Sequence, residues 1–233
     1  MDKRIECVVV GAIETNCWFY PLDDETKGKR HCVVIDPGDE APGIISRLTK
    51  LNWIPRYIFL THGHFDHVLA LPDLLEAFAK GVFGDEKPPQ IGIHRLDANY
   101  LGKNALPVHR RCFTAVGESP AFLDSVRKPM PEADTLFEEG DTAGPFKVLH
   151  VPGHTPGSVG FLDEEAGVLF SGDTLFMGAW GRTDLPGGSE EDIYKSLKRL
   201  LTLRLPALNG GIRVFPGHGP PTTIEDEAEL LSN

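Results

Sequence analysis

The sequence predicts an α/β fold in which helices cover β-sheet. Three observations support this prediction. Short apolar runs typical of strands alternate along the chain with segments whose apolar residues have helical spacing. The 233 residues, 41% of them hydrophobic, are enough for one sizeable core. No linker, low-complexity tract or internal repeat divides the chain, so we expect a single domain over residues 1–233.

The first half alternates strand and helix patterns. Short apolar runs bounded by turn residues predict strands at residues 5–10, 16–20, 31–36, 57–61 and 91–94. The second and third of these form a predicted hairpin, joined by the polar loop 23–30. Apolar residues at helical spacing predict helices over residues 44–51, 68–80 and 96–101.

Between residues 102 and 139 the periodic signals weaken, because prolines and glycines interrupt any repeat. We expect a long excursion here. A loop of this length in a compact domain is more often functional than idle, so it either covers a site or packs against a partner subunit.

The second half repeats the alternation. Strands are predicted at residues 147–151 and 212–215, and a hairpin from residues 159–162 and 168–171. A helix over residues 189–201 has Ser189 as its predicted N-cap and three acidic residues in its first turn. A short helix over residues 225–231 closes the chain.

Composition excludes several classes of protein. The net charge of −11 argues against nucleic-acid binding, which needs an excess of Lys and Arg. No apolar run approaches the ~20 residues of a membrane span, and the run at residues 5–10 is too short for a secretory signal. The four cysteines form no close pairs in sequence, which favours free thiols in a reducing cytoplasm. No feature indicates an oligomeric state.

The densest chemical signal is the segment Thr61-His62-Gly63-His64-Phe65-Asp66-His67, at the end of the predicted strand 57–61. Imidazole and carboxylate are ligands for zinc, iron and similar metals. His62 and His64 are two residues apart on an irregular segment, so they can converge on one ion. Asp66 and His67 are adjacent and would point elsewhere, toward a second ion.

Three later loops share one design, in which a predicted strand ends in a glycine-rich turn that carries His or Asp. These turns contain His154, Asp173 and His218. A lone residue of this kind beside glycine is more often part of a turn. Four such loops in one chain are a stronger signal, and if their strands lie side by side, all four open at one edge.

The four loops supply five imidazoles and two carboxylates, namely His62, His64, Asp66, His67, His154, Asp173 and His218. Two ions that each keep an open position for water or substrate need about this number of ligands if one carboxylate bridges them. Asp173 is the expected bridge. We expect the remaining histidines to be structural, with His150 in a strand and the other three, His31, His94 and His109, at the surface.

This set of motifs resembles the metallo-β-lactamase superfamily. The matching segments are residues 61–67, 152–158, 171–176 and 216–219, in that order. The resemblance implies an αββα sandwich, with two mixed β-sheets face to face, helices outside, and a metal site at one edge. It also implies a division of ligands. One ion is held by His62, His64 and His154, the other by Asp66, His67 and His218, and Asp173 bridges them.

Within this superfamily, residues 171–188 look most like the glyoxalase II group, which hydrolyses the thioester S-D-lactoylglutathione. The resemblance implies two zinc ions, with iron or manganese as alternatives, and a small-molecule thioester as substrate. Only ten residues follow Thr223, so the C-terminal helical domain of the full-length form has no counterpart here. The expected relatives are therefore the short forms, and the expected substrate is lactoylglutathione or a related thioester.

Two divalent ions about 3.5–4 Å apart lower the pKa of a shared water, which then attacks the carbonyl carbon. We expect Asp66 to bind metal and also to orient this nucleophile. Arg182 could bind a substrate carboxylate, although a salt bridge with Asp184 is the more ordinary role for it.

The alternative is a persulfide dioxygenase, a group that also resembles this sequence. It uses a single iron held by two histidines and one aspartate. Metal content and oxygen consumption separate the two activities.

Overall fold

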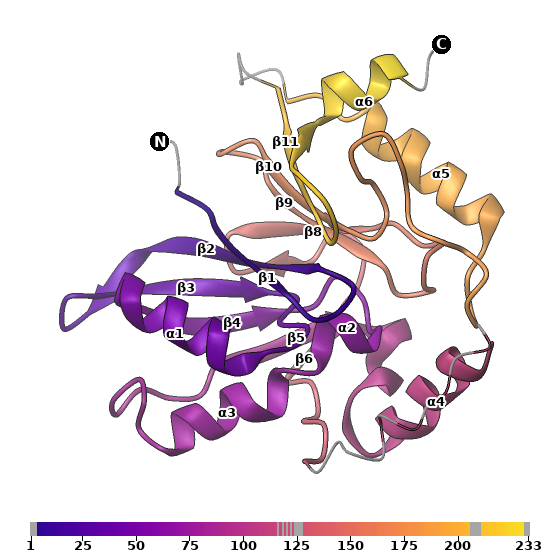
Figure 1. The fold of residues 1–233 in the computed structure, drawn as a ribbon. Coiled ribbons are helices and arrows are strands. Elements are labelled where there is room, and N and C mark those ends of the chain that lie inside the picture. The colour runs from indigo at the N-terminus through magenta and orange to yellow at the C-terminus, as the bar shows by residue number, and fades with distance from the viewer. Residues whose placement is uncertain are drawn as a thin grey trace.

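The computed structural model describes residues 4–115, 117, 119, 121, 123, 128–205 and 211–230. Two six-stranded β-sheets lie face to face, and helices cover the outer face of each sheet (Figure 1). The predicted αββα sandwich is therefore confirmed. Among the described residues, no helix is both long and apolar enough to cross a membrane.

The N-terminal sheet has the strand order β1-β2-β3-β4-β5-β6. Its strands are β1 (Glu6–Val10), β2 (Thr15–Thr26), β3 (Lys29–Ile35), β4 (Trp53–Phe59), β5 (Gln90–His94) and β6 (Thr135–Phe137). The first three are antiparallel, and β3 to β6 run parallel to one another.

The C-terminal sheet has the order β12-β11-β10-β9-β8-β7. Its strands are β7 (Thr142–Ala143), β8 (Phe146–His150), β9 (Val159–Asp163), β10 (Val168–Gly172), β11 (Arg213–Pro216) and β12 (Thr222–Thr223). Only β10 and β11 pair in parallel among these described strands. Because β8, β10 and β11 all point the same way, the loops that follow them open at one edge.

Helices α1 (Ala41–Leu51) and α3 (Leu71–Ala79) cover the N-terminal sheet, and α5 (Glu190–Leu201) and α6 (Ile224–Leu230) cover the C-terminal sheet (Figure 1). The short helix α2 (Phe65–Val68) follows β4. After β5 come two 3₁₀ segments, η1 (Arg95–Tyr100) and η2 (Gly102–Asn104), and then helix α4 (Ala105–Ala115).

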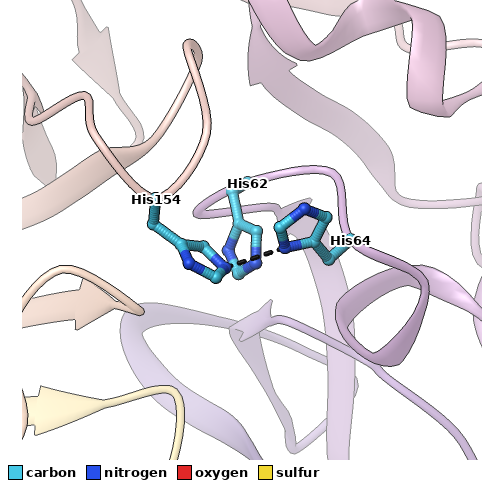
Figure 2. Close-up of side chains that lie close together, drawn as sticks. All are labelled: His62, His64 and His154. Carbon is cyan, nitrogen blue, oxygen red and sulfur yellow. Dashed lines mark hydrogen bonds between the residues drawn. The ribbon is translucent and has the colours of Figure 1, made fainter. Parts of the chain in front are cut away.

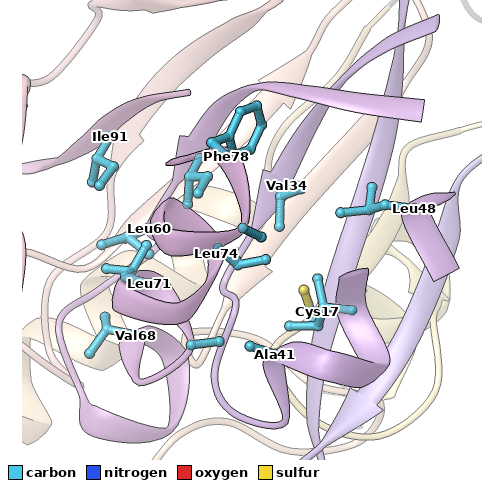
Figure 3. Close-up of a cluster of buried hydrophobic side chains, with 14 of the residues drawn as sticks. Cys17, Val34, Ala41, Leu48, Leu60, Val68, Leu71, Leu74, Phe78 and Ile91 are labelled. Atoms are coloured by element: carbon cyan, nitrogen blue, oxygen red, sulfur yellow. The ribbon is translucent and has the colours of Figure 1, made fainter. Parts of the chain in front are cut away.

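Each sheet is apolar on both faces, because alternate residues of a strand point to opposite sides. In β2, Cys17 and Phe19 pack toward α1 and α3, whereas Trp18 and Tyr20 pack between the sheets. Figure 3 shows the helix-facing layer, where Val34 of β3 lies with side chains from both covering helices. A third apolar layer joins the C-terminal sheet to α5. These three layers hold the edge that carries the metal motifs.

Several predicted boundaries were wrong for local reasons. The loop predicted at residues 23–30 is mostly strand, and the hairpin turns instead at Lys27 and Gly28, which both have positive φ. The helix predicted over residues 68–80 is α3, and it begins three residues later than predicted, at Leu71, because Pro72 favours the first turn of a helix. The predicted helix over residues 189–201 is α5, and its cap is confirmed, since Ser189 Oγ accepts the N–H of Asp192 at 3.2 Å.

The excursion predicted at residues 102–139 contains η2, α4 and β6, so it is not the long structureless loop we expected. Helix α4 buries Ala105, His109 and Cys112, which have helical spacing but are not a recognisable apolar stripe. Pro107 interrupts no hydrogen bond, because it lies in the first turn. The short strands β6, β7 and β12 have too few residues for a period-two signal.

Candidate metal centre

The segment 61–67 lies between the two sheets, anchored at Thr61. The Thr61 N–H and hydroxyl donate to the two oxygens of Asp36, at 2.8 and 2.6 Å. The Thr61 carbonyl accepts the N–H of Val159 from the C-terminal sheet at 2.8 Å. Gly63 has no space for a side chain, because a Cβ there would lie 2.3 Å from the ring of Tyr100. The backbone here is therefore held on several sides.

The imidazoles of His62, His64 and His154 converge, as Figure 2 shows. His64 Nδ1 lies 2.8 Å from His154 Nε2, and the ligand atoms of all three residues lie within 4.8 Å of one another. Burial, followed by the neighbouring imidazoles, lowers the pKa of His62 and His64 well below the usual value. Neutral imidazoles at this spacing are the form that binds metal.

A second group lies beside the first. His67 Nε2 is 3.2 Å, and His218 Nε2 is 3.4 Å, from the same oxygen of Asp66. Asp173 joins the two groups, since its Oδ1 lies 3.5 Å from His67 Nε2 and its Oδ2 lies 3.5 Å from both His154 Nε2 and His218 Nε2. All seven predicted ligands therefore meet at one edge of the sandwich.

The outer nitrogens of four imidazoles have partners that fix the tautomer. The Nδ1 atoms of His154 and His218 lie 2.7 and 3.0 Å from the carbonyl oxygens of Arg182 and Ile13, which can only accept. His67 Nδ1 lies 3.0 Å from the Asp36 carboxylate. In each case Nδ1 carries a proton, so Nε2 is the nitrogen that faces the centre and can bind metal once it is deprotonated.

The Thr61 hydroxyl fixes the position of the proton on His62 in a similar way. The Thr61 hydroxyl uses its hydrogen on Asp36, so at 3.1 Å from His62 Nδ1 it can only accept. His62 Nε2, His67 Nε2 and Asp173 Oδ1 are buried and have no hydrogen-bond partner among the described residues. Unpaired buried acceptors that face one another are costly unless a cation lies between them. The residues present thus fit a metal centre.

Asp36 is a residue whose role the sequence did not reveal, because it is simply the last residue of the predicted strand 31–36. It lies within 4.8 Å of ligand atoms of His62 and His67, and could be counted as a ligand itself. Its oxygens, however, accept from Thr61 and His67. We therefore assign it to orienting His67 and the start of the loop.

Asp97 in η1 is a second residue that the sequence did not reveal. It is fully buried and accepts hydrogen bonds from Gly63 N–H at 2.9 Å, Thr155 Oγ1 at 2.7 Å and Gly157 N–H at 2.8 Å. Gly63 belongs to the first ligand loop, and Thr155 and Gly157 belong to the loop of His154. One carboxylate therefore connects ligand loops that follow strands of different sheets.

A cavity of about 530 Å³ opens over the metal centre. Five of the seven predicted ligands line it, and Phe65, Phe113 of α4 and Arg182 form part of its wall. Of the two roles left open for the excursion, α4 fills the first, because it covers the site. Arg182 Nε and Nη2 donate to the two oxygens of Asp184 at 2.6 and 2.7 Å. Binding of a substrate carboxylate by Arg182 stays a prediction. Such a carboxylate would compete with Asp184 for the Arg182 guanidinium.

The expectation of surface positions for three histidines was wrong. His31, His94 and His109 are 8%, 5% and 1% exposed. Each has a local partner, for example Asp24 for His31 at 2.8 Å and the Tyr100 carbonyl for His109 at 3.1 Å. His150 lies in β8 as expected, and its ring stacks on that of His94 with centroids 4.2 Å apart.

Buried His109 predicts a specific acid sensitivity. Burial lowers its pKa to about 4, whereas an unfolded histidine has a pKa of about 6.5. Between these values the unfolded chain takes up a proton that the folded chain does not. The free energy of unfolding should therefore fall as pH drops from about 6.5 to about 4, by about 3 kcal/mol for this group.

This expectation is tested by denaturant unfolding of metal-free wild-type protein and of His109→Gln at pH 7, 6, 5 and 4. The difference in unfolding free energy between the two proteins should shrink toward low pH, because glutamine does not titrate. A difference that stays constant across the series would contradict the assignment.

Comparison with known proteins places this geometry in context. Residues 11–218 match the family model described as the metallo-beta-lactamase superfamily. The chain is 36% identical over 224 residues to the hydroxyacylglutathione hydrolase GloC of Haemophilus influenzae, covering 96% of this chain and 94% of that protein. It is 33% identical to the probable metallo-hydrolase YqgX of Bacillus subtilis, covering 94% and 92%.

Among solved structures, the chain is similar to TTHA1623 in a di-iron-bound form, with a TM-score of 0.72 and 36% identity over 97% of this chain and 98% of that one. It is also similar to the B3 metallo-beta-lactamase BLEG-1, with a TM-score of 0.74 and 31% identity over 97% of both chains.

Proposed function

Since this chain belongs to the metallo-β-lactamase superfamily, whose members bind divalent metal ions, we propose that it is a thioester hydrolase of the hydroxyacylglutathione hydrolase (glyoxalase II) type. The observation that carries the proposal is the set of seven donor groups that meet at the floor of one cavity. The similarity of this chain to a hydroxyacylglutathione hydrolase along nearly its whole length supports thioesters as the substrate class. The four cysteines carry free thiols, in keeping with the expected cytoplasmic location.

In this proposal His62, His64 and His154 would hold one ion, Asp66, His67 and His218 would hold the other, and Asp173 would be shared between them. Imidazole and carboxylate donors suit zinc, which is the metal we propose, and they also suit iron or manganese. A di-iron form of a relative supports iron as an alternative. When bound, two divalent ions would activate a water molecule and polarise the substrate carbonyl.

Asp66 is the proposed catalytic residue. Burial alone raises its pKa, but the charge of His67 and a hydrogen bond with His218 outweigh burial and hold the pKa well below the usual value. Thr15 Oγ1 donates to Asp66 Oδ2 at 3.0 Å and fixes the orientation of the carboxylate. An ionised carboxylate at the cavity floor can accept a hydrogen bond from the attacking water and so orient it. The thiolate is a good leaving group, so no protein acid is required.

The test combines metal analysis with hydrolysis of S-D-lactoylglutathione and simple acyl thioesters. We expect about two ions per chain, and hydrolysis that is lost on chelation and restored by zinc. About one iron per chain, together with oxygen consumption on glutathione persulfide and no thioester hydrolysis, would replace this proposal by the dioxygenase alternative.

A further inference from the structure

The wall of the cavity above the metal centre is apolar. It is formed by six side chains from four separate parts of the chain, namely Ile13, Phe65, Cys112, Phe113, Phe176 and Leu185. The rings of Phe65 and Phe113 pack with centroids 4.5 Å apart, and the ring of Phe176 lies 6.0 Å from that of His218. Burial raises the pKa of the Cys112 thiol, so this wall carries a neutral thiol at physiological pH.

Among the described residues that line this cavity, none offers an unpaired cationic side chain for an anionic group. Of the described residues that line it, Arg182 is the one cation apart from the histidines of the centre. Its guanidinium is held by both oxygens of Asp184. The hydrogen bond from Arg182 lowers the pKa of Asp184 to about 2, so Asp184 stays ionised and the pair persists at physiological pH.

Away from the metal ligands, a substrate carboxylate entering this cavity would lose water and meet no unpaired cationic side chain among the described residues, which is unfavourable. An apolar group would instead pack against the half-buried rings of Phe65 and Phe113 that line the cavity, and its transfer from water is favourable. A volume of about 530 Å³ is in the range that holds a small organic ligand.

Building on the thioester hydrolase function proposed above, we infer that the preferred substrate is a neutral thioester with an apolar group against the Phe65–Phe113 wall. Glutathione thioesters, whose carrier thiol has free carboxylates, are then hydrolysed with a lower kcat/KM than neutral thioesters of the same acyl group. Two features together would produce this preference for neutral thioesters. They are the apolar wall of the cavity and the ion pair between Arg182 and Asp184.

The first experiment varies the carrier thiol and keeps the acyl group fixed. S-D-lactoylglutathione and S-D-lactoyl-N-acetylcysteamine have the same scissile bond, but only the first has carboxylates. We expect kcat/KM to be at least about tenfold higher for the neutral thioester, since the charged carrier loses hydration without gaining a cation. Asp184→Asn releases Arg182, and it should raise kcat/KM for the glutathione thioester with little change for the neutral one.

The second experiment varies the acyl chain on N-acetylcysteamine from acetyl to octanoyl. We expect kcat/KM to rise about fourfold per added methylene until the cavity is filled. Phe113→Ser should flatten this rise, whereas the matched variant Phe113→Leu should keep most of it. Calorimetric binding of the corresponding S-alkyl thioethers to metal-free protein gives a readout that does not depend on catalysis, and their affinity should rise with chain length in the same way.

The outcomes separate this inference from the function on which it rests. If no thioester is hydrolysed by metal-loaded protein, the proposed function fails, and the thioether series alone decides whether the wall selects apolar groups. If thioesters are hydrolysed, but lactoylglutathione surpasses its neutral counterpart or chain length has no effect, the inference about specificity is overturned and the hydrolase proposal stands.

Discussion

Replacing Asp173 by alanine is expected to lower thioester hydrolysis on the order of a thousandfold or more, since bound metal stabilises the transition state by several kcal/mol. Asp173 is the carboxylate that faces both ligand groups, with oxygens 3.5 Å from His67, His154 and His218. Without it, each group loses an anionic donor and the positive charges of two ions would be poorly balanced. Metal content per chain should therefore fall together with activity.

Metal content by elemental analysis and kcat/KM with an acyl thioester are the two measurements. Asp184→Asn is a matched control, because it removes a nearby carboxylate that is bound to Arg182 and is not one of the seven predicted ligands. Its metal content should equal that of wild type. Wild-type turnover by Asp173→Ala would remove the basis for a shared metal centre.

Asp97→Ala is expected to have the second largest effect, although Asp97 contacts no predicted ligand side chain. Truncation would leave the buried N–H groups of Gly63 and Gly157 without acceptors, at a cost of about 1–3 kcal/mol each. Thr155 loses less, because its hydroxyl also lies 2.8 Å from Ser158 Oγ. We expect the free energy of unfolding to fall by about 2–5 kcal/mol.

Because Asp97 joins the loop of His62 and His64 to that of His154, metal affinity should fall as well, by about 10–100-fold. Titration with zinc followed by calorimetry measures the loss of metal affinity. Denaturant unfolding measures the fall in the free energy of unfolding. Asp97→Asn keeps the volume and one carbonyl acceptor, so it should give an intermediate value for both. A destabilised Asp97→Ala protein with wild-type zinc affinity would show that this carboxylate stabilises the fold without positioning the ligand loops.

Much of this molecule could be predicted from local sequence signals. Strands β9 and β10 are buried on both faces because both sheets are covered, so they appear in the sequence as short, largely apolar runs. The cap of α5 is a local hydrogen bond between residues three apart. The seven candidate ligands stand in short glycine-containing segments that follow predicted strands, and so did not require a tertiary contact to be recognised.

Other features depend on contacts between residues far apart in sequence. Asp36 and Asp97 lie in segments with no motif, and their roles arise only when Thr61, His67, Gly63 and Gly157 are brought to them. Helix α4 escaped prediction because its buried side includes His109, whose burial is possible only with the Tyr100 carbonyl beside it.

Residue types and short-range spacing were enough to identify the candidate metal ligands and to predict layers of helix over sheet. The orientation of these ligands and the surroundings of the cavity could be learned only from the folded structure. Those properties depend on which acceptor lies behind each imidazole and which side chains meet across the edge of two sheets, and no local pattern encodes such long-range contacts.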